Sequence, residues 1–108
     1  MIIKFNNFVN ENNIIKTYND TRYETLDGKS YADIEKNNKT WHIIIIESNN
    51  KGDGTIILNN IIDDARNNNI LNITLTAIDS SISFFEKFGF KKIYEDNNSN
   101  DIPMILNL

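Results

Sequence analysis

Two glycines, Gly52 and Gly54, stand where the hydrophobic pattern of the chain changes its period. Before them, Trp41–Ile46 lacks polar alternation and is rich in β-branched residues, which predicts a central strand buried on both faces. After them, an amphipathic helix is expected over Thr55–Asn69, because apolar residues recur at helical spacing: Ile57, Leu58, Ile61, Ile62 and Ala65. A strand, a glycine loop and a helix therefore follow one another directly, which restricts the possible folds.

Further strands are predicted where apolar, β-branched residues lie between Asn-rich turns. They are, in chain order, Ile2–Val9, Ile14–Tyr18, Tyr31–Glu35, Thr40–Glu47, Asn72–Ala77, Phe90–Tyr94 and Ile102–Leu108. The first two and the next two are expected to form hairpins. In Asn72–Ala77 the alternation of apolar residues with threonine predicts one buried face.

A second, shorter helix is expected ahead of the last two strands. Ile82, Phe85 and Phe88 recur at helical spacing. Either Asp79 or Ser80 is expected to cap its start, and Gly89 stands where a left-handed residue would end it.

The composition limits the classes of function. A chain of 108 residues has the size of one domain, so we expect a single domain over residues 1–108. With no cysteine and one histidine, a metal site is not expected. The formal net charge of -4 argues against nucleic-acid binding and favours a cationic partner. No segment looks like a signal peptide or a membrane span, so we expect a cytoplasmic location.

The glycine loop is the strongest functional signal. Small residues between a strand and a helix let backbone N–H groups approach an anion at the helix N-terminus, and a pyrophosphate is the natural ligand. Two familiar phosphate loops are excluded, because GxxxxGK[ST] is absent and Ile57 replaces the third glycine of GxGxxG. A plain strand-to-helix turn is the alternative interpretation.

Two short motifs in the right order carry a resemblance to a known family. The segment 49–54, Asn-Asn-Lys-Gly-Asp-Gly, is similar to the acetyl-CoA loop (Gln/Arg)-x-x-Gly-x-(Gly/Ala), with Asn49 in its first position. The segment 83–90, Ser-Phe-Phe-Glu-Lys-Phe-Gly-Phe, is similar to a helix signature x-Phe-Tyr-Glu-Lys-x-Gly-Phe. Tyr31–Leu108 thus resembles the GCN5-related N-acetyltransferase (GNAT) superfamily.

The resemblance implies a fold and a donor site. The fold is α+β, three-layered, with a mixed, mostly antiparallel sheet of about six to seven strands that splays beside the central strand, and two main helices. Acetyl-CoA would be the co-substrate. Its pantetheine would pair with the backbone of Ile44, Ile45 and Ile46. Its pyrophosphate would lie on the amides of Asn50, Lys51, Gly52, Asp53, Gly54 and Thr55, helped by the helix dipole. The Lys51 side chain either assists a phosphate or is solvated.

The chain also departs from the family pattern. The tyrosine that often acts as general acid is replaced by Phe85, and an asparagine six residues earlier by Asp79. Phe85 is expected at the acyl-pantetheine region, and Asp79 is either a ligand or a helix cap. The region ahead of the central strand is shorter than usual, so the two helices that normally wall the acceptor site are not expected.

Two side chains are candidates for the base that deprotonates an attacking amine. Glu47 ends the central strand, and its alternative interpretation is an exposed carboxylate at a strand end. His42 has a suitable intrinsic pKa, but a lone histidine in a strand also serves as a cross-strand packing residue.

Three functions remain open on this basis. The first is acetylation of a protein lysine or N-terminus, since a missing acceptor wall leaves room for a macromolecule. The second is acylation of a small amine, with a second copy of the chain closing the acceptor site as a homodimer. The third is a catalytically silent acyl-CoA-binding or interaction module, favoured by Phe85, by Asp79 and by the shortened region ahead of the central strand.

Overall fold

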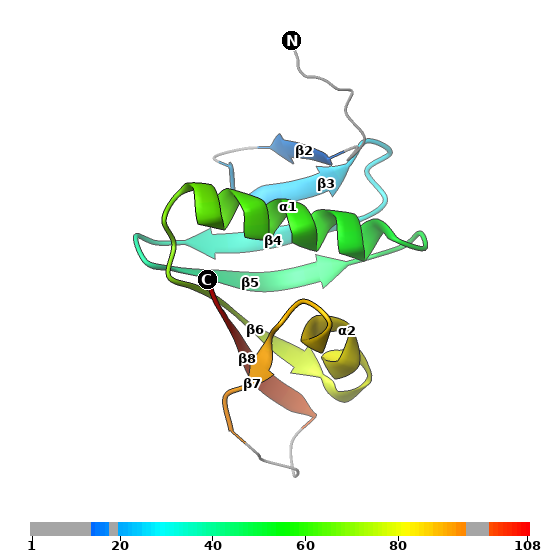
Figure 1. The fold of residues 1–108 in the computed structure, drawn as a ribbon. Helices are drawn as coiled ribbons and strands as arrows, with labels where there is room; N and C mark the ends of the chain where they lie inside the picture. The colour runs from blue at the N-terminus through cyan, green and yellow to red at the C-terminus, as the bar shows by residue number, and fades with distance from the viewer. Residues whose placement is uncertain (1–13, 18–19, 95–99) are drawn as a thin grey trace.

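The computed structural model describes residues 14–17, 20–94 and 100–108 (Figure 1). The strand predicted at Ile2–Val9 lies outside these ranges. The described strands are β2 (Ile14–Thr17), β3 (Arg22–Thr25), β4 (Tyr31–Lys36), β5 (Thr40–Glu47), β6 (Asn72–Ile78), β7 (Lys91–Lys92) and β8 (Asp101–Asn107). The helices are α1 (Asp53–Asn67), the 3₁₀ turn η2 (Asp79–Ser81) and α2 (Ile82–Glu86).

The strands form one seven-stranded sheet in the order β2-β3-β4-β5-β6-β8-β7. β5 and β6 are parallel and every other neighbouring pair is antiparallel. The parallel pair is joined through α1, the crossover that such a pair needs. The mixed, mostly antiparallel sheet with β5 as its central strand is therefore confirmed.

The predicted splay is present between β5 and β6. Their parallel pairing runs from Thr40 opposite Asn72 to Ile43 opposite Leu75 and ends there, although β5 continues to Glu47. The β4–β5 register also shifts at this point, because Ile34 faces Ile43 while the preceding residue of β4 faces Ile45. Ile44 is thus the extra residue of a β-bulge, a feature that bends the strand carrying it.

Burial of β5 on both faces is a prediction that proved wrong: up to Ile43 one face is buried and the other, with Thr40 and His42, is partly exposed. Trp41 and Ile43 are buried, but Ile44 is 62% exposed and Ile45 is 41% exposed. The bulge breaks the alternation of the strand, and the neighbouring strand on one side has already separated.

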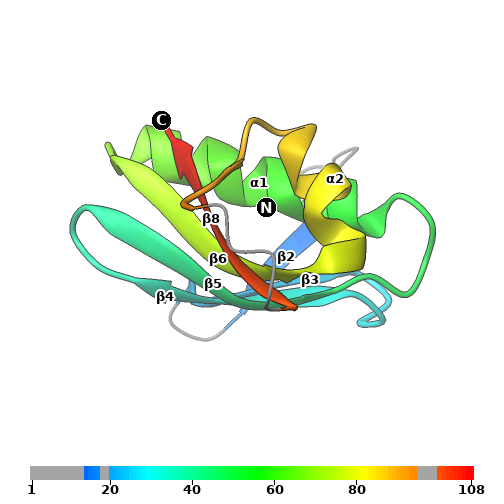
Figure 2. The same ribbon diagram turned by 90° about the horizontal axis from the view of Figure 1, so that it is seen from below.

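Both helices cover the same face of the sheet (Figure 2). The buried residues of α1 pack on this face together with the inward residues of β3 to β6. The turn after α2 reaches β8 on the same side, since a Cβ at Gly89 would lie 3.2 Å from Leu106 Cδ1. The described residues therefore form two layers, and the third layer expected from the sequence is not among them. No helix within these residues is long and apolar enough to cross a membrane.

The opposite face of the sheet, called the far face below, carries the polar side chains. Directly paired residues on neighbouring strands share a face. Buried Ala32 and Ile34 of β4 point toward the helices, so the residues alternating with them lie on the far face, as do their partners on β5. Glu47, opposite Tyr31, and His42, opposite Glu35, are placed there by this pairing.

The helix ends follow local backbone chemistry. α1 begins at Asp53, two residues before the predicted start, after Gly52 with φ of 90°. Neither Asp79 nor Ser80 caps α2 with its side chain, so that prediction was wrong: the chain enters the η2 turn at Asp79, and Ser81 precedes α2. Gly89 has φ of 100°, as expected for the residue that ends the helical segment.

Replacing Gly89 by alanine should destabilise the fold. A left-handed conformation costs an L-residue about 1–2 kcal/mol, and the new Cβ would crowd Leu106 Cδ1 at 3.2 Å. Each kcal/mol corresponds to about 4–8 °C in Tm for a domain of this size. Thermal unfolding followed by circular dichroism is the measurement, with Lys87→Ala as control, since Lys87 is exposed and has an ordinary φ of -62°. Equal Tm values for the two variants would contradict the left-handed conformation and close packing of Gly89.

Candidate functional site

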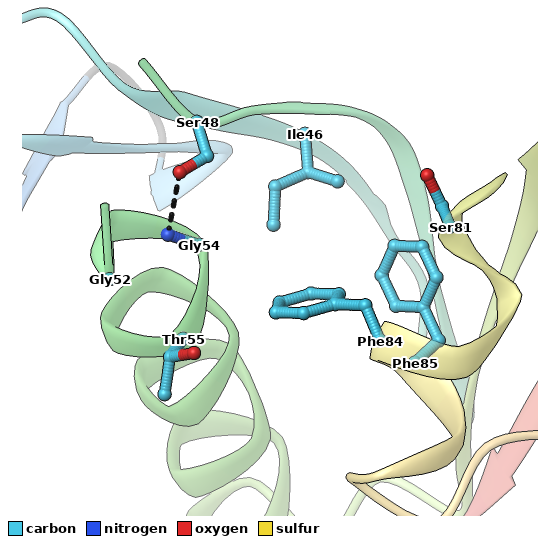
Figure 3. A pocket seen from close by; sticks show the side chains of 8 residues that line it. All are labelled: Ile46, Ser48, Gly52, Gly54, Thr55, Ser81, Phe84 and Phe85. Carbon is cyan, nitrogen blue, oxygen red and sulfur yellow. Dashed lines mark hydrogen bonds between the residues drawn. The ribbon is translucent and has the colours of Figure 1, made fainter. Parts of the chain in front are cut away.

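A cavity of about 320 Å³ lies between the loop that leads into α1 and the segment that follows β6. Figure 3 shows Ile46 and Phe84 pointing into this space, with Ser81 and Phe85 on the side of α2. Its lining residues are Ile46, Ser48, Gly52, Gly54, Thr55, Ser81, Phe84 and Phe85. The cavity is thus flanked by the part of β5 that has separated from β6 and by the residues just after β6.

The loop at one wall of the cavity has a defined hydrogen-bonding pattern. Gly54 N–H donates to Ser48 Oγ at 3.0 Å (Figure 3), and Asp53 N–H donates to the carbonyl of Asn50 at 3.1 Å. The N–H groups of Gly52 and Thr55 donate to none of the described residues. Both residues line the cavity at the N-terminus of the 15-residue helix α1. Unpaired amides and the helix dipole together provide a binding site for an anion.

Gly54 lies in a tightly packed part of the loop. A Cβ at this position would lie 3.3 Å from Phe84 Cζ and 3.4 Å from Ser48 Cβ. α2 therefore approaches the start of α1 closely, and a side chain at position 54 would require Phe84 or Ser48 to shift slightly. At Gly52 a Cβ would meet nothing within 4 Å, so glycine there is favoured by its φ of 90° alone.

The phenylalanines form the apolar wall. Phe85 is buried and meets Phe84 and Phe90 edge-to-face, with ring centroids 5.2 Å and 5.8 Å away. Sequence reasoning nominated only Phe85 for this region. Phe84, Ser48 and Ser81 were missed; Phe84 occupies the phenylalanine position of the second motif, which was a usable signal.

The structure brings together only part of the predicted donor site. Ile46, Gly52, Gly54, Thr55 and Phe85 line the cavity. The other nominated residues do not line it: Ile44, Ile45, Asn50, Lys51, Asp53 and Asp79. Ile44 and Ile45 directly precede Ile46, and residues 50 and 51 belong to the same loop.

Asp53 faces away from the cavity. Its side chain accepts hydrogen bonds from Ser30 Oγ at 2.7 Å and from Asn50 Nδ2 at 3.1 Å. Asp53 lines instead a second cavity of about 300 Å³, together with Thr25, Leu26, Asp27 and Ile56. Beside it, the N–H of Lys29 and then the hydroxyl of Thr25 lower the pKa of Asp27.

The two candidate bases lie on the far face, and neither lines the cavity. Glu47 is the last residue of β5 and is exposed. The Nδ1 of His42 is 2.8 Å from Thr74 Oγ1, within the part of β5 that still pairs with β6. His42 thus has the cross-strand contact of its alternative interpretation, whereas Glu47 lies beyond the point where the strands separate.

An ion pair also occupies the far face. Arg22 donates to Asp33 through Nε at 2.8 Å and through Nη2 at 3.0 Å, and its guanidinium lies 4.2 Å from the centre of the Tyr31 ring. This bidentate hydrogen bond lowers the pKa of Asp33. Within the described ranges, no cluster of three or more ionisable side chains suited to a metal ion is present.

Comparison with solved structures identifies the fold. Ard1 from Thermoplasma volcanium superimposes with a TM-score of 0.69 at 18% identity, covering 84% of this chain and 72% of that one. A GNAT family acetyltransferase from Elizabethkingia anophelis with acetyl-CoA bound gives 0.63 at 17% identity, covering 85% and 72%. The ribosomal-protein-S18-alanine N-acetyltransferase from Escherichia coli gives 0.66 at 16% identity, covering 88% and 69%.

The sequence comparisons add the family. No curated protein matches the chain significantly. The family model described as acetyltransferase (GNAT) domain matches residues 10–107, which is nearly the whole sequence. With the splayed sheet, the glycine loop at the start of α1 and this match, the chain belongs to the GNAT family of acetyltransferases.

Proposed function

We propose that the chain transfers an acetyl group from acetyl-CoA to the amine of a protein lysine or N-terminus, by direct attack in a ternary complex. The observation that carries this proposal is the cavity itself. It extends from unpaired backbone amides at the start of α1 to the place where β5 and β6 separate. One end suits an anion, and the other reaches a gap in the sheet.

The donor would lie along this cavity. The amides of Gly52 and Thr55 would receive the pyrophosphate, with Lys51 beside them. The pantetheine would follow Ile44–Ile46, where β5 has no strand partner on the β6 side, so its amides can pair with main-chain groups. Phe84 and Phe85 would cover the apolar part of the pantetheine and the acyl group.

The chemistry requires a neutral amine. A lysine with a pKa of about 10.4 is only about 0.1% neutral near pH 7.4, a penalty of roughly 4 kcal/mol. A base on the acceptor side reduces this penalty. Glu47 is our candidate because it lies on the far face, next along β5 from Ile46 in the cavity wall. His42 is the alternative. A free cysteine thiol has a pKa of about 8.5, and for a leaving thiol of similar pKa the acceptor's own proton can serve in place of a tyrosine at position 85.

The choice of a protein acceptor rests on the far face. No described helix covers it, so an extended peptide can reach the separated strands from that side (Figure 2). The Escherichia coli neighbour, named for the alanine of a ribosomal protein, is consistent with such an acceptor. A silent acyl-CoA-binding module is the second candidate, and Phe85 in place of the tyrosine favours it.

Acetyl-CoA should stabilise the fold. A ligand at 100 times its Kd adds about 2.7 kcal/mol if it does not bind the unfolded chain, which corresponds to a rise in Tm of about 10 °C or more. Differential scanning fluorimetry with millimolar acetyl-CoA is the measurement. An unchanged Tm would count against donor binding, whereas a rise without thiol release in the presence of amines would favour the silent module.

Thr55→Glu should separate donor binding from stability. Thr55 is exposed, lies in the first turn of α1 and lines the cavity. A carboxylate in the first turn of a helix stabilises it by about 0.3–1 kcal/mol, but it would repel a pyrophosphate on the same amides. We expect Kd for CoA, measured by calorimetry, to rise by about tenfold or more while Tm is maintained.

Asn59→Glu is the matched control for this variant. Asn59 is exposed one helical turn further along and does not line the cavity. The Asn59→Glu substitution adds the same negative charge at a greater distance from the proposed phosphate position. If both variants weakened CoA binding equally, the phosphates would have to bind elsewhere.

If Glu47 is the base, Glu47→Gln should leave CoA affinity nearly intact and lower the acetylation rate by roughly 10²–10⁴-fold. The loss should shrink as the pH approaches the pKa of the acceptor amine, because neutral amine then forms without help. Rates from pH 7 to pH 10 test this, with Glu35→Gln as control for a far-face carboxylate. Full activity of Glu47→Gln at pH 7 would exclude Glu47, and His42→Gln would be measured next.

A further inference from the structure

An aspartate inside the proposed phosphate loop poses an electrostatic problem. Asp53 lies between Gly52 and Gly54, and its negative charge would oppose a pyrophosphate on the neighbouring amides. Its side chain is directed away from the main cavity, toward the turn between β3 and β4. The contacts that hold the Asp53 carboxylate in this position therefore determine how much negative charge a bound phosphate would meet.

Ser30 makes the central contact. It is fully buried, with an exposed fraction of 0%. Its Oγ donates to Asp53 Oδ2 at 2.7 Å and accepts from the backbone N–H of Asn49 at 2.9 Å. One hydroxyl therefore binds the loop both at its first residue and at its charged residue, using its donor and one acceptor site.

The turn that carries Ser30 is itself fixed. Thr25 N–H donates to the carbonyl of Ser30 at 3.0 Å, and Gly28 N–H donates to the carbonyl of Thr25 at 2.8 Å. Two asparagines of the loop reach the same turn, since Asn49 Nδ2 donates to the carbonyl of Lys29 and Asn50 Nδ2 donates to Asp27 Oδ2. The turn is thus joined to the loop by several hydrogen bonds.

We propose that Ser30 is a positioning residue for donor binding. It holds the Asp53 carboxylate on the side of the loop away from the phosphates and fixes the loop in its binding conformation. This inference rests on the proposed function, because it assumes that CoA binds at the N-terminus of α1. It adds a role for a residue outside both motifs, on the β3–β4 turn.

The first test compares Ser30→Ala with Thr25→Val. Thr25 carries another buried hydroxyl on the same turn, and its side-chain hydrogen bonds stay within the turn. We expect Ser30→Ala to raise Kd for CoA by roughly tenfold and Thr25→Val to change it by less than about threefold. At saturating acetyl-CoA, kcat of Ser30→Ala should match wild type. If Ser30→Ala does not fold, Ser30→Cys keeps the size of the side chain and weakens the donor.

A second test measures how much of the loss in CoA affinity comes from the charge of Asp53. Without the Ser30 hydroxyl, the Asp53 carboxylate keeps, among the described contacts, the hydrogen bond from Asn50 Nδ2 and loses the shorter one. Asp53→Asn in the Ser30→Ala background should therefore recover most of the lost affinity, with Asp53→Asn alone completing the cycle. The loss in Ser30→Ala should also shrink as salt concentration rises. A role in stability alone predicts no such recovery.

The outcomes separate the two proposals. If wild type does not bind CoA, the proposed function fails. If wild type binds CoA and folded Ser30→Ala or Ser30→Cys binds it equally well, the role of Ser30 is overturned. Weakened binding that Asp53→Asn does not relieve would also overturn it, because the carboxylate would then play no part.

Discussion

The end of pairing between β5 and β6 is the constraint on which the rest of the site depends. The parallel ladder stops at Ile43 and Leu75, while β5 continues to Glu47. A bulge at Ile44 bends β5 at the same point. Main-chain groups of β5 beyond Ile43 have no strand partner on the β6 side, so they are open to a ligand that can replace the missing strand. The cavity lies beside this stretch, and the loop into α1 forms its other end.

The features that depend on neighbours in sequence could be predicted. The change of period at Gly52 located α1 to within two residues, and the apolar face read from its spacing is buried. Alternation in β6 gave the correct buried face. Gly89 was expected to be left-handed from its place after a short helix, and it is. Each of these depends on spacing within a dozen residues, where backbone geometry and side-chain period determine the result.

The features that depend on distant segments of the chain could not be predicted from the sequence. The exposure of Ile44 and Ile45 follows from their register against β4 and from the loss of β6, and neither can be read from an isoleucine run. The packing reason for Gly54 depends on Phe84, thirty positions later in the sequence. Aspartate is a common helix-capping residue, yet at Asp79 the chain enters a 3₁₀ turn that precedes α2. For the isoleucines and for Gly54, contacts with distant segments determine the result, and no local pattern reveals them.

The loop at the proposed donor site is held in place by hydrogen bonds to the rest of the chain. Ser48 already occupies the amide of Gly54, and the β3–β4 turn binds Asn49, Asn50 and Asp53 through hydrogen bonds. These contacts order the loop when the chain folds. Binding of a ligand would then not require a further loss of loop entropy. The polar residues of the loop are therefore explained by the turn behind them, and only the unpaired amides are left for a ligand. Asp53 would then be compatible with the proposed phosphate position, because its hydrogen bonds with Ser30 and Asn50 direct its charge away from the cavity.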